Sequence, residues 1–192
     1  MKLNDLYHQL SEVFDGTEPI EAHAKKALLE SAPLAQFSGT AAELPAEIAD
    51  VMTAPDAHPI CRLLARTPLP WAPPGTSDDK LYIRHSDCKA HVELVGPDGL
   101  VESDQVRLGL YGMLPESEYG IRTHAAEEIY IMLAGSALWK VAELPYIAHG
   151  TGERSFHPSM IEHGTRTAEK AFMSVYVWHG DISTDSYVYT GK

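Results

Sequence analysis

The pattern of apolar positions changes near residue 67. Before that point apolar side chains recur at steps of three and four residues, as in LNDLYHQLSEVF, which is typical of amphipathic helices. Thr17 is a candidate cap, and Pro19 is suited to the first turn of the helix that follows it. We therefore expect helices over residues 3–14, 18–32, 44–53 and 58–67.

From residue 80 onward the chain has short runs rich in β-branched and aromatic residues, bounded by Gly, Pro, Asp or Ser, which predict strands. These runs are KLYIRH, HVELVG, QVRLGLYGML, EEIYIMLAGSALWKVA, RSFHP, EHGTRT and AFMSVYVWHG. The proline-rich segment TPLPWAPPGTSDD before them predicts a loop. The expected organisation is a helical region over residues 1–66 packed on the barrel, a connecting loop over 67–79, and a β-barrel over 80–192.

Composition and charge restrict the partners. The 192 residues are 44% hydrophobic and 22% charged, an ordinary globular composition. The net charge of −12 argues against nucleic acid and anionic membranes, since both attract basic surfaces. No apolar run approaches the roughly 18 residues of a membrane span, and the first residues do not resemble a secretory signal. We expect a cytoplasmic monomer or homodimer that binds a small molecule and keeps Cys61 and Cys88 as free thiols.

Within YGIRTHAAEEIYIMLAG, His124, Glu128 and Tyr130 stand at offsets of 0, +4 and +6. On a helix, at about 100° per residue, Tyr130 would lie roughly 240° from His124. On a strand, every even offset points to one face, so the three side chains would converge. A polar group facing a core is costly unless it is satisfied, and these side chains are able to bind a metal ion.

The spacing of four residues resembles the first signature of the cupin superfamily: Gly120, His124, Glu128 and Gly135. A second cupin segment is similar to HPSMIEH, with Pro158, with Met160 where glycine is usual, and with His163. One departure is Arg122, which occupies the place of the first histidine of the usual H-x-H pair and cannot bind a metal. The resemblance implies a mainly β fold, an antiparallel jelly-roll barrel.

Within the cupins, the E-x-Y motif of Glu128 and Tyr130 with an upstream Tyr119 resembles the cupin-type dimethylsulfoniopropionate (DMSP) lyases, the DddQ-like members in particular. The resemblance implies that His124, Glu128, Tyr130 and His163 bind one divalent metal ion. Imidazole, carboxylate and phenolate suit zinc, iron(II) or manganese(II). It also implies a tyrosine base, either Tyr130 or Tyr119. We favour Tyr130 because it shares a strand face with Glu128.

Three further residues are candidates for binding the zwitterionic substrate. Arg122 is either a solvated charge or a clamp for a carboxylate. Tyr176 and Trp178 lie on the last long predicted strand and either pack in the core or hold a sulfonium group by cation–π attraction. His157 and His179 are expected at the surface or behind the metal ligands.

The resemblance implies a metal-dependent lyase that cleaves DMSP into acrylate and dimethyl sulfide by β-elimination. Two alternatives remain at this point. Two histidines and a glutamate also resemble the iron(II) triad of oxygen-using cupins, which would make the protein an iron-dependent dioxygenase. The second alternative is a lyase-like cupin that binds a small ligand without turnover.

Overall fold

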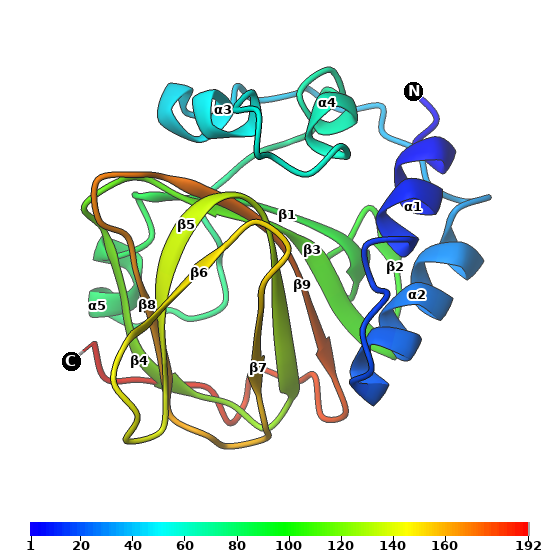
Figure 1. The fold of residues 1–192 in the computed structure, drawn as a ribbon. Coiled ribbons are helices and arrows are strands. Elements are labelled where there is room, and N and C mark those ends of the chain that lie inside the picture. Colours follow the sequence, from blue (N-terminus) through cyan, green and yellow to red (C-terminus); the bar gives the residue numbers. More distant parts are fainter. Residues whose placement is uncertain (192) are drawn as a thin grey trace.

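A hydrogen-bonded sheet of ten strands dominates residues 1–191, the part of the chain that the computed structural model describes (Figure 1). The strands are β1 (Lys89–Gly96), β2 (Val101–Glu102), β3 (Val106–Met113), β4 (Glu118–Thr123), β5 (Glu127–Val141), β6 (Ile147–Gly150), β7 (Arg154–His157), β8 (His163–Arg166), β9 (Phe172–His179) and β10 (Val188–Tyr189). The predicted cupin-like, mainly β fold is confirmed.

The long strand β5 connects the two halves of the sheet. Its first half pairs with β9 and β7, and its second half pairs with β8 and β6. The pairing shifts between Met132 and Ala134, followed by Gly135 at a φ of 70°. A Cβ atom at Gly135 would lie 2.0 Å from the carbonyl oxygen of Ala171, so only glycine fits this bend. The strand order runs from β10 to β2 without pairing these two ends, so the hydrogen-bonded barrel is open.

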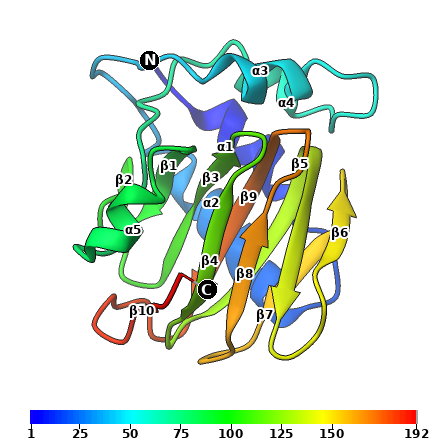
Figure 2. The ribbon, with the colours of Figure 1, turned by 90° about the vertical axis from the view of Figure 1, so that its left-hand side faces the viewer.

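The four predicted N-terminal helices are present as α1 (Asn4–Ser11), α2 (Pro19–Ser31), α3 (Ala46–Met52) and α4 (Cys61–Leu64). Figures 1 and 2 show α1 and α2 beside one sheet, with α3 and α4 over one end of the fold. Pro19 begins α2 as expected, but Glu18 rather than Thr17 precedes it, without a capping side-chain hydrogen bond. None of the described helices is long and apolar enough to cross a bilayer.

The segment KLYIRH was predicted as a strand, and this prediction is wrong. It forms a fifth helix, α5 (Lys80–Arg84). The carboxylate of Asp79 accepts hydrogen bonds from the backbone N–H groups of Leu81 and Tyr82, at 2.8 and 3.0 Å. This N-cap satisfies amide groups that a strand would have paired with a neighbour.

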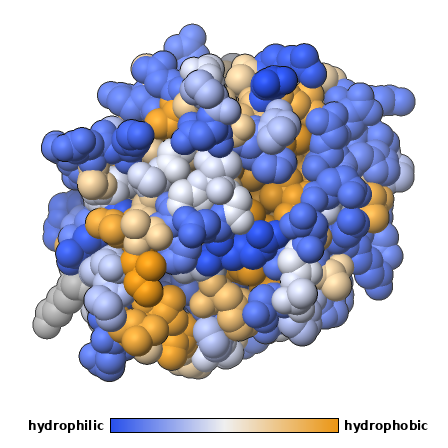
Figure 3. Space-filling model, in the orientation of Figure 1, coloured by the Kyte–Doolittle hydropathy of each residue, from blue (hydrophilic) through white to orange (hydrophobic). Residues whose placement is uncertain are grey.

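The two faces of the sheet bury different kinds of side chain. The outer face contributes aliphatic residues such as Val92, Leu108 and Val175, which share one core with the helical residues Leu6 and Leu28. The inner face forms a second, largely aromatic core that includes Tyr111, Tyr130, Trp139, Phe172, Tyr176 and Trp178. Polar side chains cover most of the molecular face drawn in Figure 3, with hydrophobic residues in separate patches.

Two polar contacts attach the helical region to the strands. The hydroxyl of Tyr7 in α1 donates to the carbonyl oxygen of Leu94 in β1, at 2.6 Å. Glu21 in α2 is buried and pairs with Arg154 at the start of β7, at 3.2 Å. Both contacts join a helix to a strand, and none of the four residues belongs to the aromatic inner core, so the helices stabilise the sheet from outside.

The two cupin-like segments meet at Met160. Its backbone N–H donates to the carbonyl oxygen of His124, at 2.9 Å. Met160 has a φ of 61°, the left-handed region in which side chains with a Cβ atom are strained. The glycine that is usual at this position would adopt this conformation without strain.

We therefore predict that Met160→Gly stabilises the protein by up to about 1 kcal/mol, because relief of left-handed strain exceeds the entropic cost of glycine. The Met160 side chain is exposed, so little packing is lost. Met160→Val should destabilise the protein, since a β-branched residue is more strained at this φ. Thermal denaturation of the three proteins tests the ranking, and equal melting temperatures would contradict it.

Candidate metal and substrate site

The carboxylate of Glu128 lies at the centre of the inner core, with only 1% of the residue exposed. In β5, Glu128 pairs in register with Trp178 of β9 on one side and with His157 of β7 on the other. The indole N–H of Trp178 donates to Oε1 at 2.5 Å, and Nδ1 of His157 lies 2.9 Å from Oε2. Sheet register therefore supplies partners for both oxygens.

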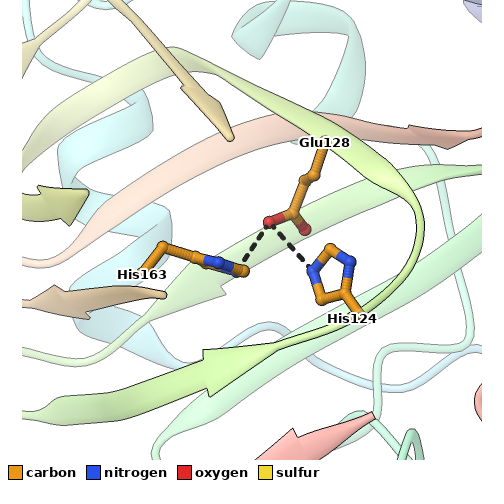
Figure 4. A group of neighbouring side chains, drawn as sticks. All are labelled: His124, Glu128 and His163. Carbon is orange, nitrogen blue, oxygen red and sulfur yellow. Dashed lines mark ion pairs between the residues drawn. The ribbon is translucent and has the colours of Figure 1, made fainter. Parts of the chain in front are cut away.

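Two further histidines approach the same oxygen of Glu128 (Figure 4). Nε2 of His163 is 3.2 Å from Oε2, and Nε2 of His124 is 3.6 Å from it. His163 is the first residue of β8, whereas His124 lies in the turn between β4 and β5. The prediction that His124 and Glu128 share one strand is thus wrong, but the predicted convergence is present.

The tautomers of His124 and His163 follow from their backbone contacts. Each Nδ1 lies 3.0 Å from a carbonyl oxygen, that of Ala126 for His124 and that of Ile161 for His163. Nδ1 must carry the proton to donate to a carbonyl, so Nε2 presents a lone pair. Both Nε2 atoms are buried without a hydrogen-bond partner among the described residues.

These three residues fit a divalent metal ion. Their ligand atoms lie within 4.8 Å of one another, and metal bonds of about 2.1 Å would separate tetrahedral ligands by roughly 3.4 Å. Burial alone would raise the pKa of Glu128, but the hydrogen bonds that it accepts, that of His157 among them, hold it well below its ordinary value. Burial, and then the charge of Arg122, lowers the pKa of His163 well below its usual range. Glu128 is thus ionised and His163 neutral, as metal ligands must be.

Tyr130 follows Glu128 on the same face of β5, paired in register with Tyr176 of β9 and Ser155 of β7. Tyr130 and Glu128 line one cavity. Burial, and then the negative charge of Glu128, raises the pKa of Tyr130 well above its ordinary value. The phenol is therefore protonated beside the ionised Glu128.

Tyr119 lies in β4 and lines the same cavity. Its hydroxyl shares a hydrogen bond of 2.5 Å with the hydroxyl of Tyr187. Its ring contacts two cations: Nζ of Lys89 is 3.4 Å from the ring centroid, and Cζ of Arg122 is 3.8 Å from it. Both candidate bases are thus beside the cavity, but the Tyr119 hydroxyl already has a partner.

Arg122 is buried, so the interpretation that it is a solvated charge is wrong. It pairs in register with His163 across β4 and β8. Its Nη2 atom lies 4.0 Å from Oε2 of Glu128 and has no hydrogen-bond partner among the described residues. A cation therefore occupies the position of the usual cupin histidine without neutralising Glu128 through a direct hydrogen bond.

The cavity beside Glu128 has a volume of about 460 Å³. The proline-rich loop forms part of its wall, since Ala72 and His91 of β1 exchange backbone hydrogen bonds of 3.1 and 2.8 Å. Tyr176 and Trp178 also line it. The Tyr176 hydroxyl contacts Nε2 of His91 at 2.7 Å, and the Trp178 ring stacks on His124 with centroids 4.0 Å apart. Tyr176 and Trp178 thus line the cavity and also contact the imidazoles of His91 and His124.

Sequence reasoning missed two inward-facing polar residues, Lys89 and His91. His157 is fully buried behind Glu128, which is the second of the two positions expected for it. Lys89 and His91 were not singled out, although they alternate with the aliphatic Ala90 and Val92. That alternation is a detectable signal, but it does not say which face lines a cavity.

Comparison with known proteins gives the family. Residues 15–174 match the family model described as dimethylsulfoniopropionate lyase. The dimethylsulfoniopropionate lyase DddQ of Ruegeria pomeroyi is 37% identical over 91 residues, which are 47% of this chain and 45% of that relative. The aligned region is therefore less than half the length of that relative.

Two solved structures have the same fold over nearly the whole chain. The crystal structure of DddQ from Ruegeria pomeroyi has a TM-score of 0.64 at 27% identity, covering 97% of this chain and 96% of that one. A structure from the set titled DMSP lyases RdDddP and RnDddQII has a TM-score of 0.65 at 22% identity, covering 99% and 100%. The match of the family model over most of the sequence shows that this chain belongs to the dimethylsulfoniopropionate lyase family.

Proposed function

We propose that this protein cleaves DMSP into acrylate and dimethyl sulfide by β-elimination. The observation that carries the proposal is one cavity lined by Glu128, Tyr119 and Tyr130. Glu128 forms the metal-competent group with His124 and His163, and it lies 4.0 Å from the buried Arg122. This combination suits a substrate whose carboxylate must accept additional negative charge during the reaction. The family match supports the same substrate class.

The charges around the cavity favour one orientation of a zwitterion. Arg122 lies near Glu128, and it is the cation suited to a substrate carboxylate. Elsewhere on the cavity wall, Glu93 and Asp98 share one cation, Arg107, at 2.9 and 3.0 Å. That end carries the excess of negative charge. The aromatic side chains of Tyr111 and Tyr176 also line the cavity and suit a sulfonium group.

Tyr130 is the proposed base, acting as the tyrosinate; a bound divalent ion would favour that form by lowering the pKa of the phenol. Tyr130 takes the proton from the carbon next to the carboxylate; the electron pair of that C–H bond forms the C=C bond of acrylate. The C–S bond breaks, and its electrons leave with sulfur as neutral dimethyl sulfide, so no general acid is required. A divalent ion bound to His124, Glu128 and His163 would supply positive charge that offsets Glu128 and polarises the substrate carboxylate.

The proposal extends to the cofactor and the setting. Two imidazoles and a carboxylate, with Tyr130 as a further ligand, suit zinc, iron(II) or manganese(II). Cys61 and Cys88 are free thiols, which supports a reducing cytoplasm. We also propose that the protein acts on a small zwitterion as a monomer or homodimer and does not bind nucleic acid.

The purified protein should release dimethyl sulfide from DMSP, detected by gas chromatography, with oxygen excluded. Glu128→Gln should abolish release and lower bound metal in elemental analysis, because an amide is a poor ligand. Glu127→Gln is the matched control, since that carboxylate pairs instead with the half-buried His179. Oxygen-dependent turnover without dimethyl sulfide would favour the dioxygenase. Full metal content in Glu128→Gln would exclude the proposed ligand set.

Tyr130→Phe should lower kcat by roughly 100-fold or more, the usual effect of losing a general base. Tyr119→Phe should act mainly through KM, because its hydroxyl is bonded to Tyr187. Tyr146→Phe, outside the cavity lining, controls for the loss of a hydroxyl. The assignment is reversed if Tyr119→Phe is inactive while Tyr130→Phe keeps most of its kcat in steady-state assays.

Arg122→Met should raise KM for DMSP by about 10- to 100-fold, the equivalent of one charge-assisted hydrogen bond of roughly 1.5–3 kcal/mol. Arg166→Met is a suitable control, because Arg166 is an exposed arginine paired with Glu118. Circular dichroism would establish that both variants are folded. A KM change below threefold in Arg122→Met would rule out the clamp.

A further inference from the structure

Tyr187 is a phenol beside the site that does not itself line the cavity. Its hydroxyl shares a hydrogen bond of 2.5 Å with the hydroxyl of Tyr119, which does line the cavity. The Tyr187 ring is nearly parallel to the ring of His124, with centroids 6.1 Å apart. Tyr187 therefore lies behind a cavity-lining tyrosine and next to a residue of the metal-competent group.

The segment that follows β9 brings Tyr187 to this position. Its strand β10 pairs antiparallel with β4. On one side of Tyr187, Oγ of Ser186 accepts the backbone N–H of Ala125 at 3.0 Å, in the turn between β4 and β5. On the other side, the backbone N–H of Thr190 donates to the carbonyl oxygen of Ile121 at 2.9 Å. Hydrogen bonds on both sides thus hold the backbone of Tyr187 against β4 and the turn after it.

Alternation along this segment turns two tyrosines inward. Tyr187 and Tyr189 are two residues apart and share one face, whereas Val188 between them is exposed. The hydroxyl of Tyr189 accepts the backbone N–H of Gly120 at 3.0 Å and so attaches the segment to β4. Tyr187 is the member of this pair whose hydroxyl contacts the hydroxyl of Tyr119.

The ring of Tyr119 is fixed by contacts of its own. Nζ of Lys89 lies 3.4 Å from the ring centroid, and Cζ of Arg122 lies 3.8 Å from it. These contacts restrict the ring but not the rotation of its O–H bond, which turns to suit its hydrogen-bond partners. The direction of that hydrogen depends instead on the hydroxyl of Tyr187.

The two hydroxyls carry two hydrogens, and only one of them lies between the two oxygens. Tyrosine is protonated at neutral pH, and burial raises the pKa of both Tyr119 and Tyr187 further. When Tyr187 is the donor, the hydrogen of Tyr119 is free to point to a third group. Because Tyr119 lines the cavity, a ligand in the cavity is able to be that group.

We propose that Tyr187 is a positioning residue for the reaction: by donating to the oxygen of Tyr119, it directs the Tyr119 hydrogen to the carboxylate of the substrate. The inference rests on the proposed function, which supplies that carboxylate. It also gives the C-terminal segment a part in the site, although this segment lies beyond residue 174, where the match to the family model ends.

A double-mutant cycle tests the role, with the full-length protein as purified and release of dimethyl sulfide from DMSP as the assay. Tyr187→Phe should raise KM by roughly 3- to 10-fold and keep kcat within about twofold, because one neutral hydrogen bond is lost and the ring is retained. The double variant Tyr119→Phe, Tyr187→Phe should have the kcat/KM of Tyr119→Phe alone, since no hydroxyl is then left to direct. Because the cycle is evaluated on kcat/KM, it applies whichever tyrosine is the base.

Thermal denaturation separates positioning from a structural role. Tyr7→Phe is the control for a structural hydroxyl, because Tyr7 donates to the carbonyl oxygen of Leu94 on the helical side of the sheet. Tyr7→Phe should lower the melting temperature and leave KM unchanged. The same outcome in Tyr187→Phe would show a purely structural phenol and overturn the proposal.

A second result would also overturn it: an equal fold-change in kcat/KM from Tyr187→Phe in the wild-type protein and in Tyr119→Phe. Tyr187 would then act independently of Tyr119. Failure of the proposed function has a different signature, because the wild-type protein itself would release no dimethyl sulfide, and the inference would fail with it.

Discussion

Burial of the Glu128 carboxylate is the constraint on which the interior of this fold depends. An ionised carboxylate without water requires donors, and here they come from separate strands: Trp178 from β9 and His157 from β7. A slip of one residue in β5 would turn Glu128 to the aliphatic outer face and leave these partners unsatisfied. The register of the strands, the turn that carries His124 and the protonation of the imidazoles therefore all depend on Glu128.

The inner core is in turn rich in cations and phenols. Arg122 takes the position at which cupins usually have a histidine, and Lys89 lies across the Tyr119 ring from the same region. A metal ion would add further positive charge, so a bound carboxylate or an ionised tyrosine becomes the natural counter-charge. The arrangement is thus suited to developing negative charge rather than to a neutral apolar ligand.

Much of the architecture could be predicted from local patterns, because helix periodicity and strand alternation are local properties. The same patterns placed Glu128 and Tyr130 on one face. They failed at α5, where the single side chain of Asp79 caps a helix, and at His124, which reaches the site from a turn. The position of His157 depends on the pairing of β5 with β7, and the burial of Lys89 depends on which face of β1 is turned inward. These are long-range facts that no local pattern contains.

The aliphatic core beneath α1 and α2 lies on the outside of the sheet, away from the cavity. Most of the hydrophobic stabilisation is therefore supplied by residues that never meet a ligand. The inner face, by contrast, contributes the polar side chains of the metal-competent group. A scaffold divided in this way separates the residues that hold the sheet to its helices from the residues that carry the chemistry.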